Sequence, residues 1–248
     1  MQQIAIILGS TRPQRKGEAV AKWVLEHASE RHDALFTLID LREVDLPFLD
    51  EGIPPSHGRY QHEHTKRWAK TIARFDGFIL VTPEYNHGTS AVLKNALDFL
   101  YGEWNNKAAG FVSYGGMSGA RAVEQLRQVM AELQVATVRA QVGFALARDF
   151  KDGKFTPADG HEKELTTMLD QLVAWSAAMR QVRLPTGGEV ESGIPGFHHV
   201  VGPDGRVMAR MEPDADSTDR ADTGTGDQPG NIGDDRFMTS SHPKKQER

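Results

Sequence analysis

Three polar loops, each placed directly after a short apolar run, constrain this chain more than any other feature. The loops span residues 9–18, 82–88 and 113–119. Near-continuous apolar runs are typical of strands that are covered on both faces of a parallel sheet. The carboxyl ends of parallel strands share one edge of the sheet, and ligands bind in the crevice outside that edge. The three loops are therefore predicted to form one composite site.

Strand signals and helix signals alternate along most of the chain. Strands are expected at residues 3–8, 35–40, 77–82, 108–114 and 137–142. Apolar residues at helical spacing predict helices at about residues 17–31, 62–75, 90–101, 118–133 and 161–180. Strand–helix units repeated in this way predict an α/β domain built on a parallel sheet. We expect this domain to occupy residues 1–183.

The composition changes after Arg183. Residues 214–235 are nearly all Asp, Gly, Thr, Ser and Pro, and such a segment buries too little apolar area to offset the entropy lost on ordering. Residues 184–248 are therefore predicted to be a mostly disordered extension. Within it, two short apolar runs flank a Pro-Asp-Gly turn, which predicts a hairpin over residues 197–211.

Charge and composition argue against several classes of protein. The formal net charge of −5 lacks the excess of Lys and Arg that a nucleic-acid interface needs. The absence of cysteine excludes disulfides and thiol catalysis. No run approaches the roughly eighteen apolar residues of a membrane span, and no signal peptide opens the sequence. We expect a soluble cytoplasmic protein with no nucleic-acid or membrane partner.

The first loop has the composition of an anion site. It opens a helix, so its amides and the positive end of the helix dipole favour a bound anion. Ser10, Arg12, Arg15 and Lys16 add further donors, which suits a phosphate monoester, although an ordinary polar turn is the alternative. The loop lacks the Gly-Lys-Ser/Thr ending of a Walker A motif and the Gly-x-Gly-x-x-Gly pattern of a dinucleotide-binding motif. Asp40 is accordingly interpreted as a strand-end or cap residue, not a ribose ligand.

The second and third loops are suited to a flat ligand. Pro83-Glu84-Tyr85-Asn86 supplies a rigid turn and a planar side chain. Ser113-Tyr114-Gly115-Gly116 allows close approach of the backbone, because two successive glycines carry no side chain. Each loop alone is compatible with a simple turn or hinge. Together the three predict a site with a phosphate at one end, a ring in the middle and donors for negative charge beyond it.

Other polar residues carry less functional weight. His57, His62 and His64 lack the ligand pattern of a zinc site, so no metal is expected. His87 lies at the mouth of the second loop, where it either contacts substrate or serves the loop itself. Ser10 lies outside any nucleophile elbow. No catalytic acid, base or nucleophile is therefore predicted.

The loop residues resemble those of NADPH-dependent FMN reductases and related quinone and azo reductases of the flavodoxin-like fold. The matching motifs are Gly9-Ser10-x-Arg12, Thr82-Pro83-Glu84-Tyr85-Asn86, Leu93-Lys94-Asn95-Ala96-Leu97-Asp98 and Ser113-x-Gly115-Gly116. The resemblance covers roughly residues 2–182. It implies a doubly wound sheet of five parallel strands in the order 2-1-3-4-5.

The resemblance also implies the residues of the site. Those expected to hold the FMN phosphate are Ser10, Arg12, Arg15 and the backbone of Gly17 and Glu18. Those expected to line the isoalloxazine are Pro83, Glu84, Tyr85 and Asn86, with Ser113, Gly115 and Gly116 at its pyrimidine end. Many relatives carry Ser and Asn where this chain has Arg15 and Gly17, so the detailed phosphate contacts are expected to differ.

By this resemblance the chain is expected to be an FMN-dependent oxidoreductase. NADPH or NADH would supply a hydride, which passes through the flavin to a quinone, an azo compound or free flavin. The alternative is a non-enzymatic flavodoxin-like electron carrier or a regulatory flavin-binding module. A homodimer or tetramer is expected, with the helix that carries Lys94 and Asp98 at an interface. The sequence leaves open the physiological acceptor, the preferred nicotinamide nucleotide and the role of the tail.

Overall fold

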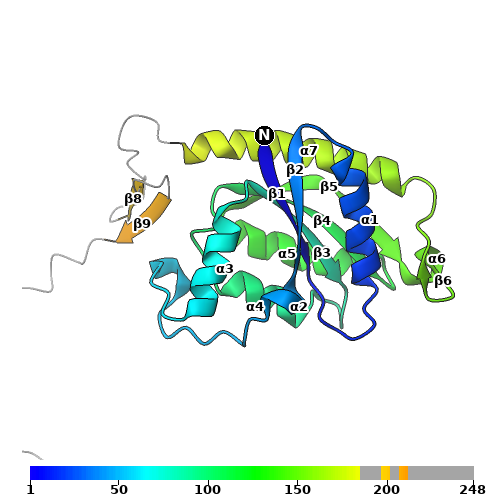
Figure 1. Ribbon diagram of the computed structural model, residues 1–248, viewed down its shortest axis with the longest axis horizontal. Helices are drawn as coiled ribbons and strands as arrows, with labels where there is room; N and C mark the ends of the chain where they lie inside the picture. The colour runs from blue at the N-terminus through cyan, green and yellow to red at the C-terminus, as the bar shows by residue number, and fades with distance from the viewer. Residues whose placement is uncertain (185–196, 202–206, 212–248) are drawn as a thin grey trace, which may run out of the picture. The chain divides into compact units, whose positions relative to one another are not determined.

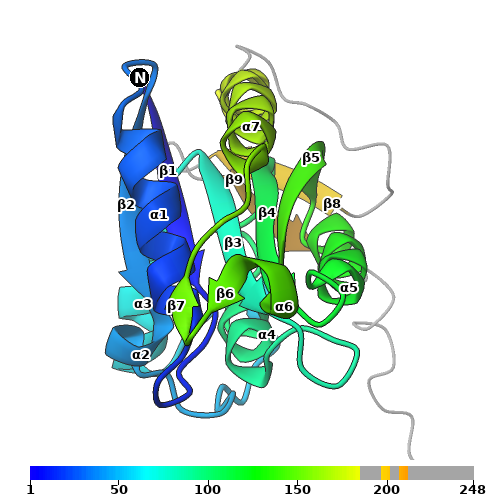
Figure 2. The ribbon, with the colours of Figure 1, turned by 90° about the vertical axis from the view of Figure 1, so that its right-hand side faces the viewer.

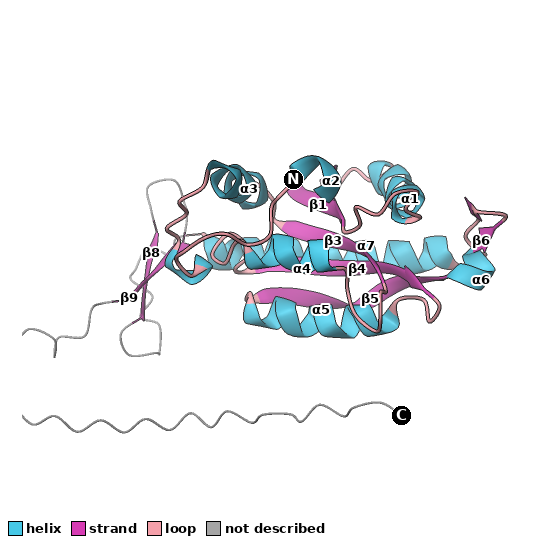
Figure 3. Cartoon of the chain, turned by 90° about the horizontal axis from the view of Figure 1, so that it is seen from below, coloured by secondary structure: helices cyan, strands magenta, loops and turns pink. Residues whose placement is uncertain are grey.

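The computed structural model describes residues 1–184, 197–201 and 207–211. Its main sheet is parallel, with the order β2-β1-β3-β4-β5. The strands are β1 (Gln2–Leu8), β2 (Ala34–Asp40), β3 (Gly77–Pro83), β4 (Lys107–Gly115) and β5 (Val135–Ala145). From β1 to β5 the order runs from top to bottom in Figure 3. The fold class and the strand order expected from the sequence are both confirmed.

Helices cover both faces of this sheet. They are α1 (Gly17–Ser29), α3 (Glu63–Ala73), α4 (Ala91–Asp98), α5 (Ala120–Glu132) and α7 (His161–Arg183). Side chains of α3, α4 and α5 share one apolar cluster with Ala5 and Ile7 of β1. Side chains of α1 and α7 share the other cluster with Ile4 and Ile6. Successive residues of a strand point to opposite faces, so β1 is apolar from Ile4 to Leu8 because both of its faces are buried there.

The carboxyl ends of the strands lie at one edge of the sheet. In Figure 1, β1 starts beside the N-terminus at the top, and the loop that follows it lies at the lower end. The short helix α2 (Leu41–Val44) and α4 lie at this lower end as well. Asp40 accepts a hydrogen bond from the amide of Arg42 and so caps α2, which confirms its interpretation as a cap residue.

Several short elements were not expected from the sequence. A 3₁₀ helix, Pro55–His57, lies in the long connection after β2. The helix α6 (Leu146–Asp149) and the antiparallel pair β6 (Phe150–Lys151) and β7 (Lys154–Phe155) follow β5 and precede α7 in the chain, and Figure 2 shows the three elements grouped together. The turn between β6 and β7 is Asp152-Gly153, a dipeptide that favours two-residue hairpin turns. The sequence therefore contained a signal for this hairpin, although the hairpin was not predicted from it.

The last described elements are β8 (Phe197–Val201) and β9 (Val207–Met211), which pair antiparallel. They coincide with the two runs for which a hairpin is expected. The Pro203-Asp204-Gly205 turn and the rest of the proposed extension lie outside the described residues, so its boundary and its disorder stay predictions. Among the described helices, none combines the length and apolar character needed to cross a membrane.

Candidate functional site

Neighbouring strands bring the three loops together. Leu8 pairs with Val81, and Thr82 pairs with Ser113, so β1, β3 and β4 end side by side. The amide of Gly9 donates to the carbonyl of Val81 at 2.8 Å, which continues the sheet into the first loop. This register places the three loops at one edge of the sheet, as the sequence predicted.

Hydroxyl groups join the first loop to the second. The Ser10 hydroxyl lies 3.1 Å from that of Tyr85, and Ser10 is 1 % exposed. The Ser90 hydroxyl donates to the carbonyl of Gly9 and accepts from the amide of Leu93 at 3.3 Å. Ser90 therefore caps α4 and fixes the start of the first loop with the same oxygen.

The first loop leads into an α1 terminus that has no side-chain cap. A Cβ atom on Gly17 would lie 2.5 Å from the Tyr114 hydroxyl, so glycine is required where the helix passes over β4. That hydroxyl is buried and has no hydrogen-bond partner within the described chain. Burial and the nearby Tyr85 raise the pKa of Tyr114 above its ordinary value, which keeps the phenol neutral.

Arg15 and Arg12 of the first loop lie in different surroundings. The Arg15 side chain is 4 % exposed and forms a two-point ion pair with Asp40. Arg12 is exposed. Burial works against ionised Asp40, but hydrogen bonds from Arg15 and from the Arg42 amide outweigh it and lower the pKa of Asp40. The ion pair therefore stays charged well below neutral pH.

The second loop is a tight turn. Tyr85 and Gly88 exchange backbone hydrogen bonds of 2.9 and 3.1 Å, and Asn86 and His87 both have positive φ, at 48° and 74°. The side chain of Glu84 turns toward α5, where its carboxylate accepts from the Arg121 amide at 3.1 Å and from Arg121 Nε at 2.7 Å. Glu84 thus fixes the turn against the first turn of α5.

His87 also contacts α5. Its Nδ1 lies 3.2 Å from Arg121 Nη1, and its carbonyl accepts from Gln125 at 3.1 Å. Its side chain therefore has a protein partner, as expected for a histidine that serves the loop. The outer position of His87 nevertheless leaves it exposed at the mouth of the turn.

The third loop packs tightly at its base and is open at its tip. The Ser113 hydroxyl is buried and donates to the Ser118 carbonyl at 2.7 Å. A Cβ atom on Gly115 would lie 3.0 Å from the Cβ of Glu84, whereas one on Gly116 would meet nothing within 4 Å. Gly115 is thus needed for packing between loops, and Gly116 leaves space for a ligand.

Each loop presents two consecutive exposed residues whose backbone amides meet no acceptor within the described part of the chain. These residues are Thr11 and Arg12, Asn86 and His87, and Gly116 and Met117. Free donors grouped at the ends of parallel strands suit a ligand with several acceptor oxygens and ring heteroatoms. The unpartnered Tyr114 hydroxyl and the glycine cradle formed by Gly115 and Gly116 are consistent with such a ligand.

Sequence reasoning missed a polar cluster beside the first loop. Asp149 is fully buried and accepts hydrogen bonds from the amides of Ala145 and Ala158, at 2.7 and 3.0 Å, and lies 3.1 Å from His161 Nε2. It therefore anchors the segment that contains α6, β6 and β7. The Nζ of Lys16 lies 4.7 Å from the ring centroid of Phe150, which places this segment against the first loop.

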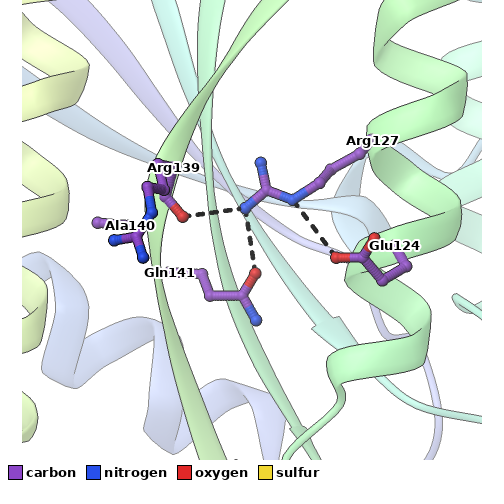
Figure 4. A pocket seen from close by; sticks show the side chains of 5 residues that line it. All are labelled: Glu124, Arg127, Arg139, Ala140 and Gln141. Atoms are coloured by element: carbon purple, nitrogen blue, oxygen red, sulfur yellow. Dashed lines mark hydrogen bonds and ion pairs between the residues drawn. The ribbon is translucent and has the colours of Figure 1, made fainter.

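An open hollow lies between α5 and β5 (Figure 4). It is lined by Glu124, Arg127, Arg139, Ala140 and Gln141. The guanidinium of Arg127 donates to the carbonyl of Val138 at 2.9 Å and to Gln141 Oε1 at 3.1 Å. Since the β4–β5 register shifts here, Arg127 satisfies groups that the ladder leaves unpaired. We interpret this hollow as structural.

The three histidines considered for metal binding do not form a metal site. The rings of His62 and His64 stack at 5.2 Å, and His64 Nε2 lies 3.0 Å from Asp50 Oδ1. His57 lies in the 3₁₀ helix. Among the described residues, no group of three or more His, Asp or Glu side chains is arranged to hold a metal ion.

Comparison with known proteins identifies the family. The model of a family described as NADPH-dependent FMN reductase matches residues 2–149, more than half of the chain. The chain belongs to this family. The family predicted from the four sequence motifs is thus confirmed, and the glycine cradle and free amides fit the FMN that the family name implies.

Individual relatives agree with this assignment. An NAD(P)H-dependent FMN reductase of Schizosaccharomyces pombe is 39% identical over 166 residues, covering 66% of this chain and 83% of that protein. A quinone reductase of Pseudomonas putida is 29% identical over 193 residues, covering 72% of this chain and 97% of that protein. These relatives are oxidoreductases, and neither favours the carrier or regulatory alternative.

A solved structure supports the fold. FerB, a flavoenzyme NAD(P)H:(acceptor) oxidoreductase from Paracoccus denitrificans, aligns with a TM-score of 0.58 at 22% identity. The alignment covers 72% of this chain and 99% of that chain. At this identity the likeness establishes the shared architecture of the two proteins.

Proposed function

We propose that this chain is an NAD(P)H-dependent FMN reductase that passes electrons to a small acceptor such as a quinone, an azo compound or free flavin. The observation that carries the proposal is the set of exposed, unpartnered amides at the ends of β1, β3 and β4. The family of the chain supplies the identity of the cofactor. When bound, FMN supplies the hydride chemistry, and the protein supplies binding, orientation and electrostatics.

The first loop is proposed to hold the FMN phosphate. The amides of Thr11 and Arg12 and the uncapped start of α1, at Gly17 and Glu18, are donors for its oxygens. The exposed guanidinium of Arg12 is free to add a charge-assisted hydrogen bond. The buried Ser10 hydroxyl fixes the loop against Tyr85 and adds a donor beneath it.

The second and third loops are proposed to hold the isoalloxazine. Tyr85 presents an exposed ring, Asn86 follows it in the turn, and the buried Pro83 fixes the end of β3 before them. Glu84 contributes by fixing that turn, since its carboxylate is bound to Arg121. Ser113 and Gly115 hold the third loop close to the sheet, and the Gly116 amide is exposed. An amide at this position would stabilise negative charge at the pyrimidine end of the ring of bound FMN.

A homodimer or tetramer is part of the proposal. The motivation is α4, on which Lys94 and Asp98 form an exposed ion pair of 2.7 Å one turn apart. Two copies of α4 packed antiparallel about a two-fold axis would place each lysine near the other copy's aspartate. Light scattering at micromolar concentration tests the assembly, and a fully active monomer would contradict it. A cytoplasmic location, which the sequence favours, also stays a prediction.

The binding of FMN and riboflavin by the apoprotein tests the proposed cofactor. The two flavins share the ring and differ in the phosphate, so the first loop should discriminate between them. We expect FMN to bind at least about tenfold more tightly, because the phosphate adds charge-assisted contacts. Equal affinity would contradict the phosphate site. Oxidation of NADPH or NADH, measured with and without a quinone, then tests the reaction.

A further inference from the structure

The carboxylate of Asp40 organises two arginines beneath the first loop. It accepts from Arg15 Nη1 at 2.7 Å, from Arg15 Nη2, and from the backbone amide of Arg42 at 2.9 Å. The side chains of Arg15 and Asp40 are only 4 % and 16 % exposed. The ion pair is therefore largely buried. Its geometry is fixed by further hydrogen bonds, from Arg15 to the Ser10 carbonyl and from the Arg42 amide to Asp40.

The two arginines hold three consecutive carbonyl groups of the loop. Arg15 Nη1 donates to the carbonyl of Ser10 at 2.5 Å. Arg42 Nη2 donates to the carbonyls of Thr11 and Arg12, at 3.1 and 2.9 Å. All three carbonyls are thus directed toward guanidinium groups. Asp40 holds the guanidinium of Arg15 directly and holds Arg42 through its backbone amide.

This arrangement determines where the loop amides point. All described peptide bonds are trans, and in a planar trans peptide the N–H points opposite to the C=O. The amides of Thr11 and Arg12 therefore point away from the two arginines. Both residues are exposed, and neither amide meets an acceptor within the described chain. The next residue, Pro13, has no amide proton to present.

We propose that Asp40 is a positioning residue for the phosphate group of FMN, acting through Arg15 and Arg42 to present the amides of Thr11 and Arg12. This inference rests on the proposed function and specifies how its phosphate site is built. It also assigns Arg15 a role behind the loop. Its Nη1 is shared between Asp40 and Ser10, and its Nε is buried without a partner in the described chain.

Electrostatics alone and positioning predict opposite results for Asp40→Asn. Asp40 carries a negative charge close to the proposed phosphate, so its removal should strengthen anion binding by Coulomb's law. Release of Arg15 to bind the phosphate directly would act in the same direction. Loss of positioning should instead weaken binding, because the Ser10 carbonyl and its neighbours become free to turn toward the anion.

The experiment is a titration of the apoprotein with FMN and with riboflavin, followed by quenching of flavin fluorescence. For Asp40→Asn we expect FMN affinity to fall about tenfold, as for the loss of one hydrogen bond to a charged group, with riboflavin affinity unchanged within about twofold. The matched control is Asp45→Asn, at the exposed C-cap of α2, which removes the same charge. Its φ of 49° is a conformation that asparagine tolerates.

A second variant covers the case in which Asp40→Asn fails to fold. Arg42 is exposed, and Arg42→Lys keeps its charge while removing the planar group that reaches two carbonyls. We expect it to weaken FMN about threefold to tenfold and to spare riboflavin.

FMN affinity equal to or higher than that of the wild type, in Asp40→Asn or in Arg42→Lys, would overturn the inference. A wild type that binds FMN and riboflavin equally would overturn the proposed phosphate site itself, and the inference with it. A wild type that prefers FMN, combined with unchanged variants, would overturn only the role of Asp40.

Discussion

The buried carboxylate of Glu84 accepts hydrogen bonds from both the backbone amide and the guanidinium of Arg121, at 3.1 and 2.7 Å. The Glu84 side chain is 4 % exposed and that of Arg121 is 43 % exposed. The contact ties the second loop to the first turn of α5, beside the third loop. A residue that the sequence resemblance assigns to the flavin site therefore also connects the second loop to the helix that follows the third loop.

This contact predicts that Glu84→Gln destabilises the fold and displaces the second loop. The glutamine keeps one acceptor oxygen but loses the charge, so we expect about 1–2 kcal/mol less stability, with the partial exposure of Arg121 limiting the effect. Urea unfolding measures the loss. Glu63→Gln, which breaks an exposed ion pair with Lys66, is the control and should leave the transition unchanged. Equal stability of Glu84→Gln and the wild type would refute the prediction.

A second prediction concerns the contact between Gly17 and Tyr114. In Gly17→Ala the new Cβ would lie 2.5 Å from the Tyr114 hydroxyl and 2.9 Å from Leu8 Cδ1, which should cost about 1–3 kcal/mol of stability. Tyr114→Phe removes a buried hydroxyl without a partner in the described chain, so it should be neutral or stabilising. In the double variant the clash is partly relieved. A thermal-unfolding double-mutant cycle measures this coupling, and strict additivity would argue against it.

The fold was predictable because its signals are local and repeated. The three inner strands of the main sheet, β1, β3 and β4, are apolar runs buried on both faces, and all five strands were located to within a few residues of their ends. The segment with α6, β6 and β7 was missed because it is too short to show a period. It depends instead on Asp149, whose partners include the amide of Ala158 and the ring of His161.

The site was predictable only in its main features. The positions of the loops follow from strand order, so the sequence was sufficient to predict that Ser10, Tyr85 and Gly115 lie at the same edge of the sheet. The direction of individual side chains depends on partners far along the chain. Arg15 turns to Asp40, 25 residues away, and Glu84 turns to Arg121, 37 residues away. No local pattern indicates either pairing.

Arg12 provides a third prediction, which rests on the proposed phosphate site. Its side chain is exposed at the tip of the first loop. In Arg12→Ala a charge-assisted contact is lost, so FMN affinity should fall roughly tenfold to a hundredfold, and riboflavin affinity should not change. Arg139→Ala removes an equal charge on β5, away from the loops, and serves as the control. Unchanged FMN affinity in Arg12→Ala would remove this residue from the site.

The last prediction concerns Lys107, at the amino end of β4. Its Nζ donates to the carbonyl of Ile72 at 2.8 Å, and the residue is 4 % exposed. Burial, with a smaller contribution from Arg183, lowers the pKa of Lys107 to about 7. In the unfolded chain the pKa is about 10.4. Between these values the unfolded state binds more protons than the native state, so stability should rise with pH.

Lys107→Met removes this titration. The free energy of unfolding of the wild type, relative to the variant, should therefore increase between pH 7 and pH 9, by about 1–3 kcal/mol, since one pKa unit corresponds to about 1.4 kcal/mol. Urea unfolding at a series of pH values measures the difference. Lys70→Met, at an exposed position of α3, is the control and should differ from the wild type by a constant amount. If the curves of the wild type and Lys107→Met run parallel over this range, Lys107 is fully charged in the native state, and the effect of burial on its pKa is refuted.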